Sequence, residues 1–248
     1  MAFRAVLFDV GDTLWHSAEA PPAHEFRRLA AERAASFFAH EGISYEDPGQ
    51  AARVAWDALE AAMRKARATD LREPDYPSAA RAALEGIGLK LTHAQTADLM
   101  DAIYISGEDG GKVAYPDARR TLDELLARGF KLAIVTNRAF GGSRFRGDLS
   151  AAGLDVPWDA LSVSVEAGYL KPHPAIFQLA LDELGVGAHD ALMVGNSLAE
   201  DIAGAQALGI ATAWRRSPPD AEGVTPDFTF DEVSELLRWP ALKEPANA

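Results

Sequence analysis

The sequence predicts an α/β fold in which a doubly wound parallel sheet carries an inserted all-helical domain. Short apolar runs that end at polar or glycine residues recur along the chain, and amphipathic stretches separate the later runs. A long segment of helical periodicity follows the first run. Buried strands of a parallel sheet form such continuous apolar runs. Alternation of strand and helix is typical of doubly wound domains.

Five apolar runs are the predicted strands of the sheet. They are AVLFDVGDT from Ala5, KLAIVTN from Lys131, ALSVSVE from Ala160, ALMVGNS from Ala191 and IATAWRR from Ile210. Between the later runs lie three predicted helices, which are DARRTLDELLARG, HPAIFQLALDELGVG and SLAEDIAGAQALGI. Gly129 and Gly185 are placed to end the first two of these helices, and Ser197 is placed to cap the third.

Residues 17–113 form a predicted helical insert after the first strand. This segment contains four alanine-rich stretches with helical periodicity, and its connecting loops carry proline, glycine and aspartate. We therefore expect a core domain made of residues 1–16 and 114–248, and a separate helical domain made of residues 17–113.

Composition narrows the classes of function. The formal net charge of −13 makes the chain a poor general binder of nucleic acid or of an anionic membrane. The absence of cysteine excludes disulfides and thiolate metal sites. The first residues carry too few apolar side chains for a signal peptide, and no apolar run is long enough to cross a membrane. We expect a cytoplasmic monomer or homodimer that acts on a small molecule.

Polar residues follow several of the predicted strands. Asp9 ends the first strand, Thr136 and Asn137 end the second, and Asn196 follows the fourth, with Asp201 one helical turn later. Lys171 precedes the helix that leads to the fourth strand. Ligands bind beyond the carboxyl ends of strands in open α/β sheets. The sequence therefore predicts that these side chains converge on one site.

Four motifs in this order resemble the haloacid dehalogenase superfamily, most of whose members are phosphatases. They are FDVGDTL, YPDARRTLDELLARGFKLAIVTN, SVEAGYLKPHPAIFQLALDELGV and MVGNSLAEDIAGAQALGI. The resemblance covers residues 5–17 and 115–215. It implies a Rossmann-like core, and it implies that the helical insert is the mobile cap of the family.

The resemblance also implies roles for individual residues. Asp9 would be the nucleophile that accepts a phosphoryl group. Thr136, with Asn137 beside it, would bind a phosphoryl oxygen, and Lys171 would balance negative charge at the transferring group. Each residue also has a purely structural explanation, because aspartate, threonine and asparagine are common in strand-end turns and most lysines are solvated surface charges.

Magnesium is the cofactor that the resemblance implies. Its ligands would be the Asp9 side chain, the backbone carbonyl of Gly11 and the Asn196 side chain. Asp201 would either support these ligands from behind or contact the cation through water. The structural alternatives are a helix cap for Asn196 and compensation of the helix dipole for Asp201.

Two residues depart from the family pattern. Family phosphatases usually carry a general acid two residues after the nucleophile, where this chain has Gly11; the acid here is Asp12, one residue further on. Metal-using relatives generally have aspartate where this chain has Asn196, and an amide oxygen brings no charge to a cation. Asp12 is the candidate general acid and base, and a displacement of one residue in a tight turn points its side chain in a different direction from that of the family's acid.

The main prediction is a Mg²⁺-dependent phosphatase that acts on a small phosphorylated metabolite through an aspartyl-phosphate intermediate. Two alternatives remain. One is a catalytically weakened binding or regulatory protein of this fold, and the other is a metal-independent 2-haloacid dehalogenase. Trp15, His16 and Arg138 are candidates for the substrate entrance, although Trp15 and His16 could simply pack there and Arg138 could lie in a solvated loop.

Overall fold

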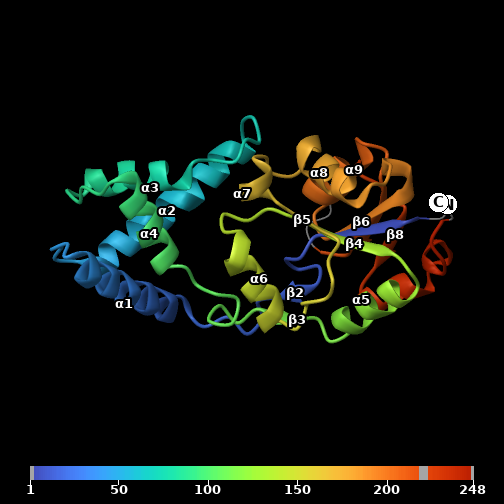
Figure 1. Cartoon of the computed structure of the whole chain (residues 1–248), viewed down its shortest axis with the longest axis horizontal. Coiled ribbons are helices and arrows are strands. Elements are labelled where there is room, and N and C mark those ends of the chain that lie inside the picture. The colour runs from blue at the N-terminus through green and yellow to red at the C-terminus, as the bar shows by residue number, and fades with distance from the viewer. Residues whose placement is uncertain (1–2, 218–222, 247–248) are drawn as a thin grey trace. The chain divides into compact units, whose positions relative to one another are not determined.

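The computed structural model describes residues 3–217 and 223–246, and the chain divides into two compact units. Met1–Ala18 and Lys112–Ala248 form the α/β unit, and Glu19–Gly111 form the helical unit (Figure 1). Both boundaries lie two residues from the predicted ones.

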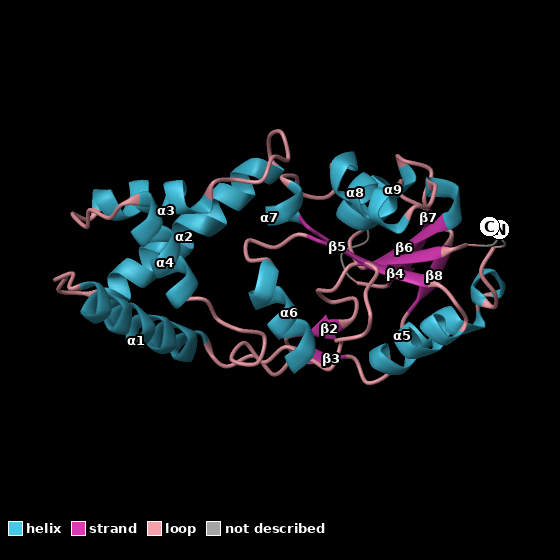
Figure 2. Cartoon of the chain, viewed as in Figure 1, coloured by secondary structure: helices cyan, strands magenta, loops and turns pink. Residues whose placement is uncertain are grey.

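A parallel sheet forms the centre of the α/β unit (Figure 2). The order of its strands is β5-β4-β1-β6-β7-β8, and every neighbouring pair is parallel. The strands are β1 (Ala5–Phe8), β4 (Lys131–Thr136), β5 (Ala160–Val163), β6 (Ala191–Gly195), β7 (Ala211–Arg215) and β8 (Phe228–Phe230). A separate antiparallel pair joins β2 (Trp15–His16) to β3 (Val113–Ala114).

Helices connect the strands of the α/β unit. The α-helices are α5 (Ala118–Ala127), α6 (Gly142–Ala151), α7 (Ser164–Ala167), α8 (Pro174–Leu184) and α9 (Ala203–Gln206). A π-helical segment, η2 (Leu198–Ile202), leads directly into α9. Short 3₁₀ segments are η1 (Ala188–Asp190), η3 (Val233–Arg238) and η4 (Pro240–Leu242).

Both faces of the sheet are covered, as the alternation of side chains along β1 shows. Val6 and Phe8 belong to a core cluster that includes residues of α5 and α6. Ala5 and Leu7 belong to the opposite cluster, which includes residues of α8 and α9. Successive side chains of a strand point to opposite faces, so a strand that is apolar throughout is buried on both. The α/β doubly wound fold class is therefore confirmed.

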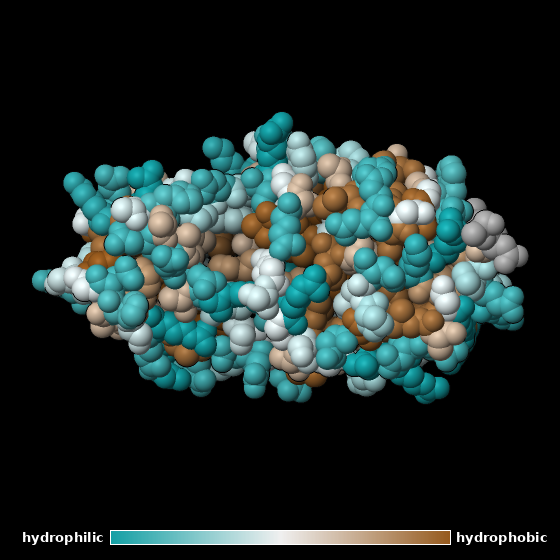
Figure 3. All heavy atoms as spheres, in the orientation of Figure 1, coloured by the Kyte–Doolittle hydropathy of each residue, from teal (hydrophilic) through white to brown (hydrophobic). Residues whose placement is uncertain are grey.

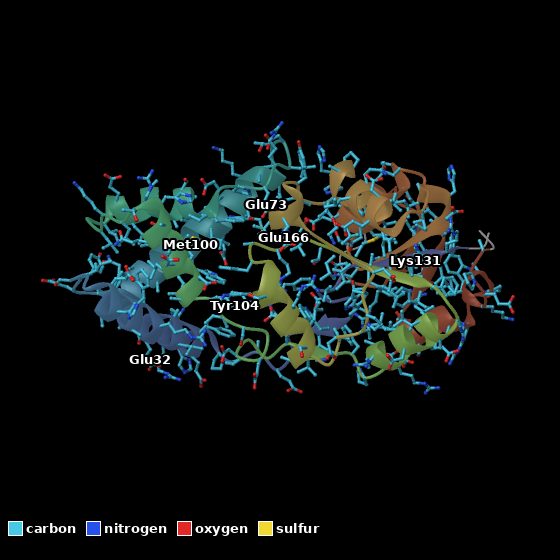
Figure 4. The ribbon with its side chains drawn as sticks, viewed as in Figure 1. Glu32, Glu73, Met100, Tyr104, Lys131 and Glu166 are labelled. Atoms are coloured by element: carbon cyan, nitrogen blue, oxygen red, sulfur yellow. The ribbon has the colours of Figure 1, made fainter. Side chains whose placement is uncertain are left out.

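The helical unit consists of four helices, α1 (Ala23–Glu41), α2 (Pro48–Arg67), α3 (Tyr76–Gly86) and α4 (His93–Ala102). Each corresponds to one of the four predicted stretches. Asp47, Asp75 and Thr92 cap the last three through side-chain oxygens that accept backbone N–H bonds. Met100 and Tyr104, labelled in Figure 4, are buried in this unit, and Arg33 of α1 donates to the Tyr104 carbonyl.

Polar side chains cover much of the visible surface of each unit (Figure 3). Within residues 3–217 and 223–246, no helix is long and apolar enough to span a bilayer.

The five predicted strands and the three predicted core helices are confirmed, and Gly129 and Gly185 adopt positive φ at two of the helix ends. The sequence patterns do not indicate β2, β3, β8, α6 or α7, and α7 begins at Ser164 within the predicted strand from Ala160. The first three have only two or three residues each. Helix α6 contains Gly142 and Gly147, which are poor helix formers. Arg144 and Arg146 lie in this helix.

The loop after β1 contains a strained residue. Asp12 has φ 53°, in the left-handed region that non-glycine residues seldom adopt. The Arg215 Nη1 atom donates to the Asp12 carbonyl at 2.9 Å and to the Tyr115 hydroxyl at 2.9 Å. The guanidinium carbon of Arg215 also lies 3.7 Å from the centroid of the Tyr115 ring. Arg215 thus links the end of β7 to this loop.

Replacement of Asp12 tests the backbone strain. We expect Asp12→Val to lower the free energy of unfolding by about 1–2 kcal/mol, because a β-branched side chain crowds the backbone at positive φ. Asp12→Gly is the control and should change it by less than about 1 kcal/mol, since glycine adopts this conformation freely but adds entropy to the unfolded chain. Urea denaturation measures both values, and equal stability of the two variants would contradict the argument.

Candidate active site

The predicted site residues come together at the carboxyl edge of the central strands. Strand β1 lies between β4 and β6, so the chain crosses from one side of β1 to the other at this point. Such a topological switch point is the usual ligand position in open α/β sheets. Asp9 directly follows β1, Thr136 ends β4, and Asn196 directly follows β6.

Asp9 is a buried carboxylate with both oxygens engaged. Its side chain is 10% exposed. Its Oδ1 atom accepts from Lys171 Nζ at 2.6 Å and from Thr136 Oγ1 at 3.2 Å. Its Oδ2 atom accepts from Thr13 Oγ1 at 3.2 Å. The backbone N–H of Asp9 donates to the Val194 carbonyl at 2.9 Å and so fixes the residue against β6.

Lys171 is fully buried and uses all three of its ammonium donors. Nζ lies 2.6 Å from Asp9 Oδ1, 2.7 Å from Asp201 Oδ1 and 2.9 Å from the Val135 carbonyl oxygen. Burial alone would lower the pKa of Lys171, but the Asp201 and Asp9 carboxylates raise it above the usual lysine range. Lys171 is therefore a fixed positive charge in this site.

Asn137 positions Lys171 through the backbone. Its Oδ1 atom accepts from the Lys171 N–H at 2.7 Å, and its Nδ2 atom donates to the Lys171 carbonyl at 3.2 Å. The same amide nitrogen donates to Glu200 Oε2 at 3.1 Å. The side chain of Asn137 thus bonds both polar backbone groups of Lys171 and links them to the start of η2.

Asp201 is the second buried carboxylate. Its Oδ1 atom accepts from Lys171, and its Oδ2 atom accepts from the Ser197 N–H at 2.9 Å. Burial raises the pKa of Asp201 to about 6, against the opposing effect of Lys171. Gly195 makes this packing possible, because a Cβ atom there would lie 2.3 Å from Asp201 Oδ2. Ser197 caps the turn as predicted, by accepting from the Glu200 N–H.

Three charges thus share a site that is almost closed to solvent. As whole residues, Asp9, Lys171 and Asp201 are 7%, 2% and 1% exposed. Together they carry one net negative charge when both carboxylates are ionised. Each buried ion costs several kcal/mol of desolvation, which close pairing and further hydrogen bonds must offset. Close clusters of buried ionisable groups such as this one are typical of functional sites.

The residues present can supply oxygen ligands to Mg²⁺. The Thr13 hydroxyl lies 3.2 Å from Asp9 Oδ2 and 3.4 Å from Asn196 Oδ1, so both oxygens lie within hydrogen-bond distance of the same hydroxyl. Within the described residues, no group of three or more His, Cys, Asp or Glu side chains could hold a metal. Mg²⁺ needs only one or two protein carboxylates, since water and substrate phosphate complete its shell. The donor set therefore fits Mg²⁺ with a single anionic ligand.

Gly11 and Asp12 are both exposed at the surface of the unit, in contrast to Asp9. A Cβ atom built on Gly11 would meet no heavy atom within 4 Å. Within the part of the chain that the structure describes, the Asp12 carboxylate has no hydrogen-bond partner, and only the Asp12 carbonyl is held, by Arg215. Within the described residues, no hydrogen bond or ion pair joins the Asp12 carboxylate to the buried cluster.

The candidate entrance residues lie beside α6 and β3. Trp15 is 3% exposed and packs edge-on against Phe145 at 6.3 Å, so it belongs to the core. Arg138 donates to Asp148 Oδ2 at 2.6 Å and lies over the Trp15 ring. His16 packs against the Tyr115 ring and accepts from the Ala18 N–H. These contacts favour the structural explanation for Trp15.

Several residues of the site were not singled out from the sequence. Thr13 and Gly195 stand within the quoted motifs, but their importance depends on contacts that span the fold. Glu200 lies within a predicted helix, and no local pattern indicates its bond to Asn137. Glu166 of α7, labelled in Figure 4, accepts from the Gly142 N–H at 2.6 Å and so ties α7 to the start of α6.

Curated proteins similar in sequence include phosphatases and a dehalogenase. Phosphoserine phosphatase of Thermus thermophilus is 33% identical over 130 residues, which are 52% of this chain and 51% of that protein. Phosphoglycolate phosphatase of Mannheimia succiniciproducens is 31% identical over 163 residues, which are 63% of this chain and 71% of that protein. (S)-2-haloacid dehalogenase 4A of Burkholderia cepacia is 33% identical over 132 residues, which are 52% of this chain and 55% of that protein. The chain spans about half the length of the first and third.

Solved structures of the same fold cover nearly the whole chain. A HAD phosphatase from Thermococcus onnurineus matches with a TM-score of 0.59 and 23% identity, covering 95% of this chain and 97% of that one. A 2-haloacid dehalogenase from Pseudomonas syringae pv. Tomato DC3000 matches with a TM-score of 0.63, the same identity and the same coverage. These likenesses show the fold.

The family model of haloacid dehalogenase-like hydrolases matches residues 3–209, which include the buried cluster of Asp9, Lys171 and Asp201. The chain belongs to the haloacid dehalogenase-like hydrolase family.

Proposed function

We propose that this hydrolase is a Mg²⁺-dependent phosphatase that acts on a small phosphorylated metabolite. The observation that carries the proposal is the Asp9 carboxylate, which is held by Lys171 and Thr136 at the switch point of the sheet. Phosphatases among the relatives support the same conclusion.

In the proposed reaction Asp9 attacks phosphorus, the bond between phosphorus and the substrate's leaving oxygen breaks, and an aspartyl-phosphate forms. Water then attacks that phosphorus, which breaks its bond to Asp9 and releases inorganic phosphate. Lys171 stabilises the negative charge of the transferring group, and Thr136 donates its hydroxyl to a phosphoryl oxygen. Asn137 acts as a positioning residue, since it holds the backbone of Lys171. Lys171 and Asn137 are held in place before substrate arrives, whereas the Thr136 hydroxyl must turn from Asp9 to the phosphoryl oxygen.

Asp9, Asn196 and the Gly11 carbonyl would hold Mg²⁺, with Asp201 acting through water. When bound, the cation would neutralise negative charge on the phosphate. We propose that the helical unit, residues 19–111, serves as the cap that excludes water during transfer.

Hydrolytic dehalogenation of 2-haloacids is the second candidate. The neutral Asn196 and the similarity to (S)-2-haloacid dehalogenase 4A favour it. In that reaction Asp9 would attack carbon and halide would leave. Halide release from 2-chloropropionate in the presence of EDTA would support it.

A binding protein of this fold would retain phosphate compounds without turnover.

Removal of the nucleophile is the first test of phosphoryl transfer. We expect Asp9→Asn to abolish phosphate release from acetyl phosphate and para-nitrophenyl phosphate, because an amide cannot form the phosphoenzyme. Release by the unmodified enzyme should require Mg²⁺ and stop with EDTA. Asp182→Asn is the matched control, since Asp182 is an exposed carboxylate on α8, and it should keep full activity. If Asp9→Asn released phosphate at the rate of the unmodified enzyme, Asp9 would not be the nucleophile.

Loss of the buried ammonium should affect both rate and stability. We expect Lys171→Met to lower kcat by about 10²–10³-fold, as removal of a preorganised charge-stabilising donor does. It should also lower the free energy of unfolding by about 3–5 kcal/mol, because Asp9 and Asp201 lose their buried partner. Steady-state kinetics and urea denaturation measure the two effects. Lys131→Met, on the exposed lysine of β4 labelled in Figure 4, is the control. A kcat equal to that of the control would exclude Lys171 from the chemistry.

A negative charge at residue 196 should strengthen metal binding. We expect Asn196→Asp to lower the Kd for Mg²⁺ by about tenfold, because affinity follows the number of charged oxygen ligands. Isothermal titration of the substrate-free protein measures this directly, without reference to turnover. Gln95→Glu, which adds the same charge in the capping box of α4, should leave the Kd unchanged. An equal Kd for Asn196→Asp and the unmodified protein would show that residue 196 is not a ligand.

A further inference from the structure

The groups that touch the Asp9 carboxylate are poorly suited to donate a proton to a leaving group. They are the Lys171 ammonium and the hydroxyls of Thr136 and Thr13. All three N–H donors of Lys171 already point at acceptors, namely the two carboxylates and the Val135 carbonyl. Both hydroxyls donate to Asp9 itself. An efficient general acid titrates near the working pH and lies within hydrogen-bond reach of the leaving atom.

The loop after Asp9 contains a second carboxylate, that of Asp12, at the surface of the unit. Gly11 has no side chain, although the space around its Cα would accept one. Asp12 is exposed and its backbone is in the left-handed conformation, with its carbonyl bonded to Arg215. Arg215 is itself held against the Tyr115 ring and hydroxyl. The Arg215–Tyr115 pair thus restrains Asp12 at the surface, while Asp9 stays buried.

We propose that the substrates are acyl phosphates, whose leaving group departs as a carboxylate without a proton, and not alkyl phosphate esters. This inference rests on the proposed phosphatase function. Asp9 attacks phosphorus, the bond between phosphorus and the carboxyl oxygen breaks, and its electron pair stays on that oxygen. A carboxylate with a pKa of about 4 is stable at neutral pH. An alkoxide is about as basic as hydroxide and needs a proton as it leaves.

The second step has a related consequence. Water attacks the phosphorus of aspartyl-phosphate, the bond to Asp9 breaks, and the proton of the water passes to solvent or to the released phosphate. General base help with this step is worth about 10²–10⁴-fold in rate. Without such help the phosphoenzyme should persist, and it should accumulate while acetyl phosphate is in excess.

The test compares leaving groups in full-length protein with Mg²⁺. The substrates are acetyl phosphate, a series of aryl phosphates of rising leaving-group pKa, and phosphoglycolate as the alkyl ester. For the unmodified enzyme we expect log(kcat/KM) to fall steeply as leaving-group pKa rises. The double variant Gly11→Asp/Asp12→Gly places an acid at residue 11 and glycine at the positive φ. It should raise the ratio of kcat/KM for phosphoglycolate to kcat/KM for acetyl phosphate by about 10²-fold or more.

Gly11→Asn/Asp12→Gly is the matched control, because it has nearly the same shape and no acid, and it should keep the steep dependence. Asp12→Asn should keep it as well. A shallow dependence in the unmodified enzyme would overturn the inference. A selective loss of alkyl and poorer aryl substrates in Asp12→Asn would do the same, by showing that Asp12 is the acid.

Intact mass measurement separates this inference from the proposed function. After brief exposure to acetyl phosphate, the enzyme should carry one phosphoryl group, which Asp9→Asn should lack. A phosphorylated Asp9 combined with a shallow leaving-group dependence would refute the substrate class and leave the phosphatase proposal intact. No phosphorylation and no turnover of any substrate would refute both.

Discussion

The Lys171 ammonium, shared between Asp9 and Asp201, is the interaction on which the rest of the site depends. It joins three segments that are far apart in the sequence, namely the end of β1, the loop before α8 and η2. Desolvation of three charges is expensive, and only close geometry offsets it. Each additional contact serves that geometry: Asn137 holds the lysine backbone, and the Ser197 N–H holds the second carboxylate.

The sheet supplies the rigid support for this cluster. Strand β1 is buried on both faces and lies between β4 and β6, so the chain positions of Asp9, Thr136 and Asn196 are set by parallel pairing and by packing from both sides. Gly195 shows how closely the parts approach, because any side chain at this position would collide with Asp201. A single small residue at the end of β6 is therefore a condition for the ion pair.

Apolar runs and helix signals in the sequence predicted the sheet, the helical insert and the strand-end residues, because buried parallel strands and capped helices leave local patterns. The partners of those residues leave no such pattern. Nothing local indicates that Asn137 bonds the Lys171 backbone and Glu200, or that Arg215 holds Asp12. Helix α6 was missed for a different reason, since tertiary packing of Phe145 and Leu149 outweighs the low helix propensity of its glycines. The residue types thus indicated where chemistry occurs, and long-range contacts decide what each residue does.

The two departures from the family pattern act on different parts of the proposed reaction. Gly11 removes a proton donor, whereas Asn196 removes a charge from the cation site. With Asp9, Lys171 and Asp201 ionised, the cluster carries a net charge of −1. Carboxylates at residues 11 and 196 as well would make the net charge −3. A less negative site repels a phosphorylated substrate less but attracts Mg²⁺ less. Mg²⁺ normally completes its shell with substrate phosphate. Under the proposed function, the anionic substrate would therefore supply much of the charge that binds the cation, and metal and substrate would strengthen each other's binding.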